Sequence, residues 1–202
     1  VSAAWSTINN YGFFSNRTPL IFLNEKFKVQ VLQLDKQIHY FKARFNQRLD
    51  FGKLSWINNV QYQKVNQEQD LDQVLGDPLA LNVPEWLIRS TLMMTSSIFN
   101  KALSFQSGAT FVFFTDYYAD QYNPLLSEFV TQNNTKIGEY PRVDFFFNAK
   151  IKSSRIFIKL ENVSAPIEHL IKVDTPYDYY AAPFKPYRDF SIRFGLIWNF
   201  FQ

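Results

Sequence analysis

The chain has 202 residues, of which 47% are hydrophobic and 18% aromatic, and it carries a net charge of +3 without a single cysteine. The missing cysteines exclude a disulfide framework and any Cys-based metal site, and the small positive charge is too weak by itself to indicate nucleic-acid binding. No run of about eighteen apolar residues occurs, which excludes transmembrane helices but leaves transmembrane strands open.

The N-terminal part of the chain predicts two strands separated by a long connection. Side chains on a strand point alternately to opposite faces, and this pattern predicts a first strand over 3–14. Three of its aromatic residues share one face: Trp5, Tyr11 and Phe13. A connection over 16–28 leads into an extended run, 29–49. Only its last part, 40–49, is expected to belong to the regular sheet.

Six further segments show the same alternation, and we predict each of them as a strand: 54–64, 86–98, 103–115, 142–152, 155–161 and 188–201. The last segment has the clearest pattern. Its apolar positions are Phe190, Ile192, Phe194, Leu196, Trp198 and Phe200. Small or polar residues stand between most of them, so one face of this strand is hydrophobic and the other is hydrophilic.

The connections between these strands alternate in length. Short turns are predicted at 50–53, 100–101 and 153–154, and long loops at 16–28, 65–84, 116–139 and 164–187. Outer-membrane barrels have short periplasmic turns and long outer loops, whereas a soluble β-domain, the alternative, has no reason to keep this asymmetry. We therefore predict an all-β protein, an antiparallel transmembrane β-barrel of about eight strands in the bacterial cell outer membrane. Residues 27–34 would then project beyond the membrane.

Several motifs in the C-terminal half resemble one family. They are Asp116-Tyr117-Tyr118-Ala119, Tyr122-Asn123-Pro124, Gly138-Glu139-Tyr140-Pro141, Arg155-Ile156-Phe157-Ile158-Lys159 and Phe194-Gly195-Leu196-Ile197-Trp198-Asn199-Phe200. Their order and spacing resemble the C-terminal part of the "putative porin" β-barrel family of Bacteroidota-type outer membranes, closely over 81–201 and more loosely before. The resemblance implies that residues 1–202 form a single barrel domain that is incomplete at its N-terminal side, with further strands upstream. The start at Val1, without a signal peptide, agrees with a processed or partial chain.

The resemblance also implies a role for the C-terminus. Barrel-assembly machinery reads aromatic residues in the last strand of such proteins. The residues expected to form this C-terminal barrel signal are Phe194, Gly195, Trp198, Phe200 and Phe201.

The charges on the polar phase of the strands are mostly positive. If the apolar phase faces lipid, ten basic residues line the lumen: Lys42, Arg44, Arg48, Arg89, Arg142, Lys150, Lys152, Arg155, Lys159 and Arg193. Only Asp144 and Glu161 oppose them, which leaves an excess of eight positive charges. Rings of Lys and Arg favour anions in a water-filled pore.

Two alternative roles stay open for these basic residues. Some of them lie near strand ends, where they would meet lipid phosphates. Acidic loop residues could also fold inward and neutralise the wall, and five are available: Asp116, Asp120, Glu128, Asp174 and Asp178.

Aromatic residues are expected to form girdles at both membrane interfaces. On the periplasmic side these are Trp198, Phe200 and Phe201; toward the outer ends of their strands they are Tyr11, Phe13, Tyr62, Trp86 and Phe113. The alternative explanation for these aromatic residues is that they simply favour strands and pack in the core of a soluble protein.

The loop 116–139, rich in Tyr, Asn and Gln, is expected to constrict the lumen, cap the barrel or dock a partner.

An enzyme is not expected. The two histidines, His39 and His169, lack ligand spacing, and no nucleophile elbow, phosphate loop or zinc motif occurs. We predict no cofactor and no metal. The expected function is passive diffusion of small hydrophilic solutes, with anions favoured; the alternative is an accessory barrel subunit of a larger outer-membrane complex without a conducting pore. Expected partners are outer-membrane lipid, lipopolysaccharide, barrel-assembly machinery and other envelope proteins, and no nucleic acid.

Overall fold

The computed structural model describes residues 1–15, 29–68, 79–100, 102–166 and 180–200. Apart from a helical turn at 164–166, the regular elements of these residues are strands, which confirms the all-β prediction. Within the described ranges no helix is long and apolar enough to span a membrane.

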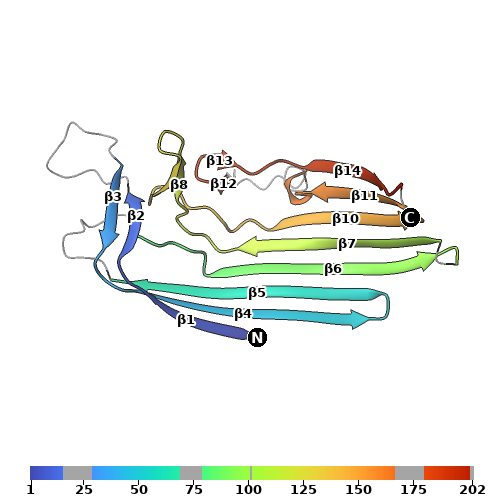
Figure 1. Ribbon diagram of the computed structural model, residues 1–202, viewed down its shortest axis with the longest axis horizontal. Coiled ribbons are helices and arrows are strands. Elements are labelled where there is room, and N and C mark those ends of the chain that lie inside the picture. Colours follow the sequence, from blue (N-terminus) through green and yellow to red (C-terminus); the bar gives the residue numbers. More distant parts are fainter. Residues whose placement is uncertain (16–28, 69–78, 101, 167–179, 201–202) are drawn as a thin grey trace.

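A large antiparallel sheet forms the body of the molecule (Figure 1). Its eight strands are, in spatial order, β1 (Ser2–Ile8), β4 (Ile38–Phe51), β5 (Leu54–Gln67), β6 (Trp86–Ile98), β7 (Leu103–Phe114), β10 (Arg142–Ile151), β11 (Ser154–Glu161) and β14 (Ser191–Trp198). The spatial order follows the chain order, as it does in an up-and-down barrel. The sheet is open, however: β1 and β14 are its two edges and do not pair with each other.

Tight turns join the strands at one end of the main sheet, at the three places where the sequence predicts them. Gly52 and Lys152 open two-residue turns with φ angles of 62° and 51°. The third turn has Phe99 and Asn100 at φ angles of 54° and 49°. Positive φ angles match the right-handed twist of hairpin strands, so these turns let neighbouring strands pair up to their ends.

The prediction of one strand over 3–14 is wrong. The strand β1 ends at Ile8, and Asn10 adopts a φ of 54°, a left-handed conformation that Asn tolerates better than most residues. This bend takes the chain out of the main sheet and into β2 (Tyr11–Ser15), which belongs to another sheet. Tyr11 and Phe13 therefore do not share a face with Trp5.

The second sheet lies at the end of the main sheet opposite the tight turns (Figure 1). It has four strands in the order β3 (Gln30–Leu34), β2, β9 (Glu128–Thr131) and β8 (Gln121–Asn123). A separate hairpin joins β12 (Tyr180–Ala182) to β13 (Lys185–Pro186). Most of these strands come from segments that the sequence assigns to the first strand or to long loops, whereas β3 comes from the early part of the extended run 29–49, which the sequence places outside the regular sheet.

The buried hydrophobic cluster of the molecule lies where the second sheet meets the main sheet. Its members are Phe13, Leu34, Ile38 and Ala80, and Ile38 is fully buried. Ile8, Tyr11, Leu32, Val65 and Leu81 pack around them. Phe13 is thus a core residue, and the prediction that it belongs to an outer aromatic girdle is wrong.

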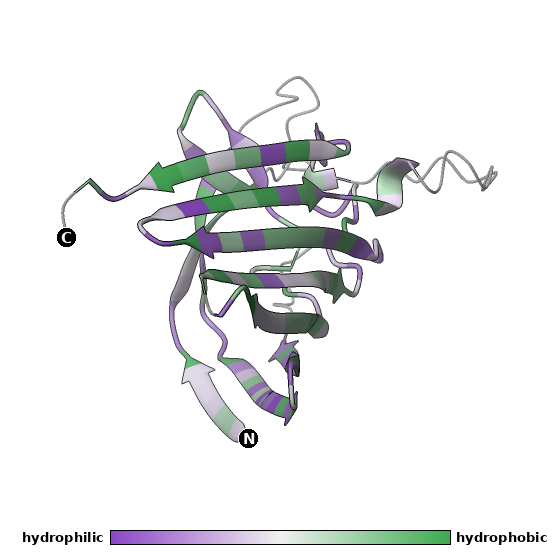
Figure 2. Cartoon of the chain, turned by 90° about the vertical axis from the view of Figure 1, so that its right-hand side faces the viewer, coloured by the Kyte–Doolittle hydropathy of each residue, from purple (hydrophilic) through white to green (hydrophobic). Residues whose placement is uncertain are grey.

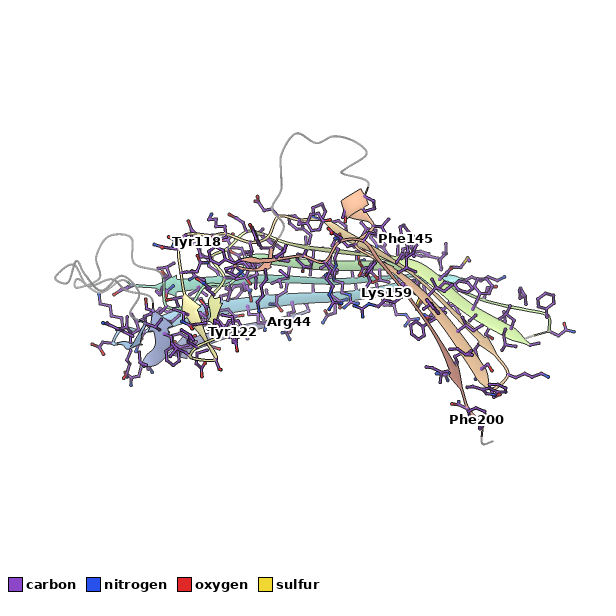
Figure 3. All side chains as sticks on the ribbon, turned by 90° about the horizontal axis from the view of Figure 1, so that it is seen from above. Arg44, Tyr118, Tyr122, Phe145, Lys159 and Phe200 are labelled. Atoms are coloured by element: carbon purple, nitrogen blue, oxygen red, sulfur yellow. The ribbon has the colours of Figure 1, made fainter. Side chains whose placement is uncertain are left out.

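The strand register gives the main sheet two chemically different faces, and Figure 2 shows hydrophobic and hydrophilic bands alternating along its strands. Phe45, Val60, Ile88 and Phe113 oppose one another across β4 to β7, and Ile158 opposes Phe147 and Phe194 across β10, β11 and β14. We call the side that carries these residues the apolar face, and the side that carries the alternate residues, such as Arg44, Thr110 and Lys159, the polar face. Figure 3 places Arg44 and Lys159 on the concave side of the curved sheet and Phe145 on the convex side.

Candidate functional site

The polar face gathers nine of the ten basic residues that the sequence assigns to the lumen. Five of the eight strands of the main sheet contribute them: Lys42, Arg44 and Arg48 lie on β4, Arg89 on β6, Arg142 and Lys150 on β10, Arg155 and Lys159 on β11, and Arg193 on β14. The assignment of Lys152 to the wall is wrong, because this residue occupies the tight turn between β10 and β11 with a φ of 51°.

The charge balance of the polar face differs from the sequence-based count. Asp50 shares this face, opposite Ser55, although the sequence pattern leaves it in a turn. Nine basic side chains stand against three carboxylates, those of Asp50, Asp144 and Glu161, so the excess is six positive charges rather than eight. The face is still strongly basic.

Three neighbouring strands carry a chain of ion pairs on this face. Asp144 lies 3.6 Å from Arg142 Nε and 3.5 Å from Lys159 Nζ. Glu161 lies 2.8 Å from both Lys159 Nζ and Arg193 Nε. Lys159 therefore bridges the two carboxylates, and the chain runs continuously from β10 through β11 to β14. The arrangement holds the basic side chains in place while it offsets part of their charge.

On the opposite half of the polar face, the Arg48–Asp50 ion pair at 3.1 Å is joined by hydrogen bonds to uncharged acceptors. Arg44 Nε donates to Gln61 Oε1 at 2.7 Å, and Tyr40 donates to Gln63 Oε1 at 2.8 Å. Further along, the hydroxyls of Thr91 and Thr110 lie 3.1 Å apart. Of the basic residues on this face, five have no carboxylate partner within the described ranges: Lys42, Arg44, Arg89, Lys150 and Arg155.

The segment 180–190, from the last long loop, packs over the polar face. Asn162 Nδ2 donates to the Arg188 carbonyl oxygen at 2.8 Å, and Tyr140 donates to Asn162 Oδ1 at 2.6 Å. The ring of Tyr187 stands over the Arg142 guanidinium at 5.6 Å. A cavity of about 540 Å³ remains between this segment and the strands β10, β11 and β14. Of the loops described, this one therefore covers part of the polar face.

The loop 116–139, which the sequence singles out as a constriction, cap or docking site, contributes two strands, β8 and β9, to the second sheet. Val130 and Thr131 pair in parallel with Phe14 and Ser15, and Thr131 Oγ1 donates to the Phe14 carbonyl oxygen at 3.2 Å. Buried Gln132 braces the loop through a 2.6 Å hydrogen bond to the Ala119 carbonyl oxygen. The loop is thus an ordered part of the end of the molecule that carries the long connections.

Among the five acidic loop residues that could neutralise the basic wall, those that the structure describes have different surroundings. Asp116 pairs with Lys136 of its own loop at 2.7 Å, and this hydrogen bond raises the pKa of Lys136. Burial raises the pKa of Asp120, and Glu128 is exposed on β9. Asp174 and Asp178 lie outside the described residues. Asp116 therefore offsets a charge of its own loop rather than a charge of the basic wall.

The expected C-terminal signal is divided between the two faces. Phe194 and Trp198 lie on the apolar face, and the Trp198 ring stacks on Phe200 with 5.0 Å between centroids. Gly195 lies on the polar face beneath the ring of Phe157, where a side chain would overlap that ring. Phe201 lies outside the described residues.

A row of aromatic residues crosses four strands of the apolar face near the loop-bearing end. The ring centroids are 6.1 Å apart for Trp5 and Phe41, 6.2 Å for Phe41 and Tyr62, and 4.8 Å for Tyr62 and Trp86. Tyr62 and Trp86 are two of the residues predicted for an outer girdle. Phe113 lies on the same face, opposite Ile88.

The described residues offer no metal-binding group of three or more His, Cys, Asp or Glu side chains. His39 lies at the end of β4, where its ring is 6.0 Å from that of Trp5. His169 lies outside the described residues.

Comparison with known proteins gives one finding. A family model described as "Putative porin" matches residues 1–202, the whole chain. Neither the curated proteins nor the solved structures contain a significant match.

Proposed function

The chain belongs to the "Putative porin" family, and from this premise we propose that its main sheet forms part of the wall of an outer-membrane β-barrel through which small hydrophilic solutes diffuse passively. The role is that of a channel rather than an enzyme. The location is the bacterial cell outer membrane, with lipid and lipopolysaccharide around the barrel and the barrel-assembly machinery as the partner that inserts it.

The observation that carries this proposal is the exposure of the apolar face. Phe194, Leu196 and Ile192 are 82%, 62% and 61% exposed. Exposed large hydrophobic residues occur on this face from β1 to β14, including Trp5, Phe45, Trp56, Leu92, Phe111, Phe145 and Ile158. Soluble monomers rarely expose a contiguous apolar patch of more than a few hundred Å². A face of this kind needs an apolar environment, which the hydrocarbon core of a bilayer supplies.

The strand lengths and hydrogen bonding support the same proposal. The strands β4 to β7 have 14, 14, 13 and 12 residues, and about 9–11 residues suffice to cross the hydrocarbon at a tilt. In lipid, each strand edge must be paired, so the open edges at β1 and β14 require closure. Eight strands alone would close around an interior that side chains fill. We therefore propose that these strands are one section of a larger barrel.

The basic polar face suggests which solutes pass most easily. On the concave side it would line the lumen, and its excess of positive charge would raise the local concentration of anions. The lumen-lining role of the nine basic residues follows from this proposal.

Planar-bilayer recordings test the function directly. The purified protein should form conducting pores, and under a salt gradient the reversal potential should indicate anion preference. Cation preference would contradict the charge argument, and the absence of conducting pores would contradict the channel itself.

A second candidate, an accessory barrel of a larger envelope complex, is favoured by one exposed hairpin tip. Between β8 and β9, Leu125 is 94% exposed, and Phe129 on β9 is 58% exposed. Stable co-purification with other envelope proteins, without conductance, would support this alternative.

A further inference from the structure

The cavity of about 540 Å³ on the polar face has a lining rich in positive charge. Five cationic side chains line it: Arg142, Lys159 and Arg193 from the strands, and Lys185 and Arg188 from the overlying segment. Three carboxylates also line it: Asp144, Glu161 and Asp189. The cations exceed the carboxylates by two, so the cavity favours a negatively charged occupant.

Two of the three carboxylates hold the cations of the wall in position. The Asp144 side chain is only 8% exposed, and its Oδ1 accepts the backbone N–H of Asn162 at 2.9 Å. Glu161 accepts hydrogen bonds from Lys159 and, at 3.3 Å, from the Ser191 hydroxyl. Because both carboxylates are engaged with protein donors, they order the neighbouring cations. The side chain of Arg193 stays 52% exposed despite its ion pair.

Arg142 supplies an independent sign that an acceptor is missing. Its Nε is buried and has no hydrogen-bond acceptor within reach, since the nearest carboxylate oxygen, on Asp144, is 3.6 Å away. A buried donor without an acceptor destabilises the folded protein. The guanidinium is otherwise held by Tyr187, whose hydroxyl lies 3.5 Å from Nη1. The Arg142 side chain as a whole is 30% exposed and lines the cavity, so its guanidinium keeps hydrogen-bonding capacity that the protein leaves unused.

We propose that this cavity is a binding site in the channel for the phosphate group of small anionic solutes. The inference rests on the proposed channel, because it names the class of solute and the place where it is held. A phosphate group presents several acceptor oxygens in different directions. It can therefore engage guanidinium and ammonium groups from the strands and from the overlying segment at once.

The test is isothermal titration calorimetry of the full protein in detergent with inorganic phosphate, at about 0.1 M chloride to screen diffuse attraction. We expect saturable binding. Arg193→Gln and Arg188→Gln should each weaken it about tenfold, as expected for one lost charge-assisted hydrogen bond. The matched control is Arg155→Gln, which removes a cation of the same face and of strand β11, outside the cavity lining. It should leave phosphate affinity within about twofold.

Two results would overturn the site: no saturable phosphate binding by the wild-type protein, or equal weakening by all three substitutions. The second result would mean that phosphate affinity depends on the overall charge of the polar face and not on this cavity. Arg193→Gln alters a strand and Arg188→Gln alters the overlying segment. If one of these variants fails to fold, the other still tests the site. Calorimetry does not depend on conduction. Phosphate binding without conducting pores would support the site and contradict the proposed channel, whereas conducting pores without phosphate binding would overturn the site alone.

Discussion

The main sheet and the second sheet bury their hydrophobic residues in opposite ways. In the second sheet and at its junction with the main sheet, Leu34 is 3% exposed and Ile38 is fully buried. On the apolar face of the main sheet, Ile192 and Phe194 are 61% and 82% exposed. The small sheet buries hydrophobic residues as a protein does in water, in a core that it shares with the adjoining end of the main sheet. The large sheet leaves its hydrophobic side chains exposed, and the proposed barrel would place them against lipid.

A charge placed on the apolar face should have the largest effect and would test this contrast. Leu92, 53% exposed, lies at the middle of β6. Leu92→Arg should destabilise the protein in lipid vesicles by about 2–4 kcal/mol, the cost of Arg near the bilayer midplane. The measurement is urea denaturation of the vesicle-inserted protein. The control is Val31→Arg on the second sheet, 72% exposed, which should be almost neutral. Equal, small effects would mean that water covers the apolar face.

A cavity in the small core should have a more local effect. Leu34→Ala should cost about 2 kcal/mol, at the lower end for a buried Leu, because a small sheet can relax around the gap. Hydrogen exchange should accelerate at the amides of β2 and β3 and remain unchanged in β6 and β7. If exchange accelerates throughout the main sheet, the two regions unfold together and the comparison fails.

The space around one glycine in each sheet shows how tightly that sheet is packed. On the polar face, a Cβ at Gly108 would overlap the Leu92 carbonyl oxygen and lie 2.8 Å from Cζ of Phe146. Gly108→Ala should therefore cost about 1–2 kcal/mol through overpacking. Gly12 on β2 is the matched control, since its Cβ would lie 3.9 Å from the Leu32 carbonyl oxygen, an ordinary contact. Urea denaturation of both variants gives the difference, and a Gly12→Ala cost as large as that of Gly108→Ala would contradict this account.

The smallest predicted effect is a pH dependence confined to the loop-bearing end. Burial raises the pKa of Asp120 above its ordinary value. The folded form therefore binds the proton more tightly than the unfolded form, and the associated stability is present at low pH and is lost as pH rises through the raised pKa. The protection factors of the β8 and β9 amides, which correct the exchange rates for the intrinsic effect of pH, should fall over that rise in pH. Asp120→Asn should abolish the change, and an unaltered pH profile in this variant would rule Asp120 out as its source.

Most of the main sheet follows from local pattern. The strand predicted over 86–98 has the same bounds as β6, and the tight turns and alternating loop lengths agree with the structure. The predicted first strand is wrong because a left-handed Asn10 interrupts an alternation that continues in a different sheet. A residue next to a turn can belong to either element, and for this reason the pattern places neither Asp50 nor Lys152 correctly.

The assignment of side chains to one face or the other of each strand is readable from the amino-acid order, because the two-residue period of a strand is a local property that any regular pairing preserves. The pairing and packing of the long loops are determined instead by the folded molecule as a whole. The parallel pairing of Phe14 with Val130, more than a hundred residues later, and the packing of Tyr187 on Arg142 both join segments with no common periodicity. Such contacts depend on the shapes of the loops and on the completed sheet beneath them, and no pattern of neighbouring residues encodes them.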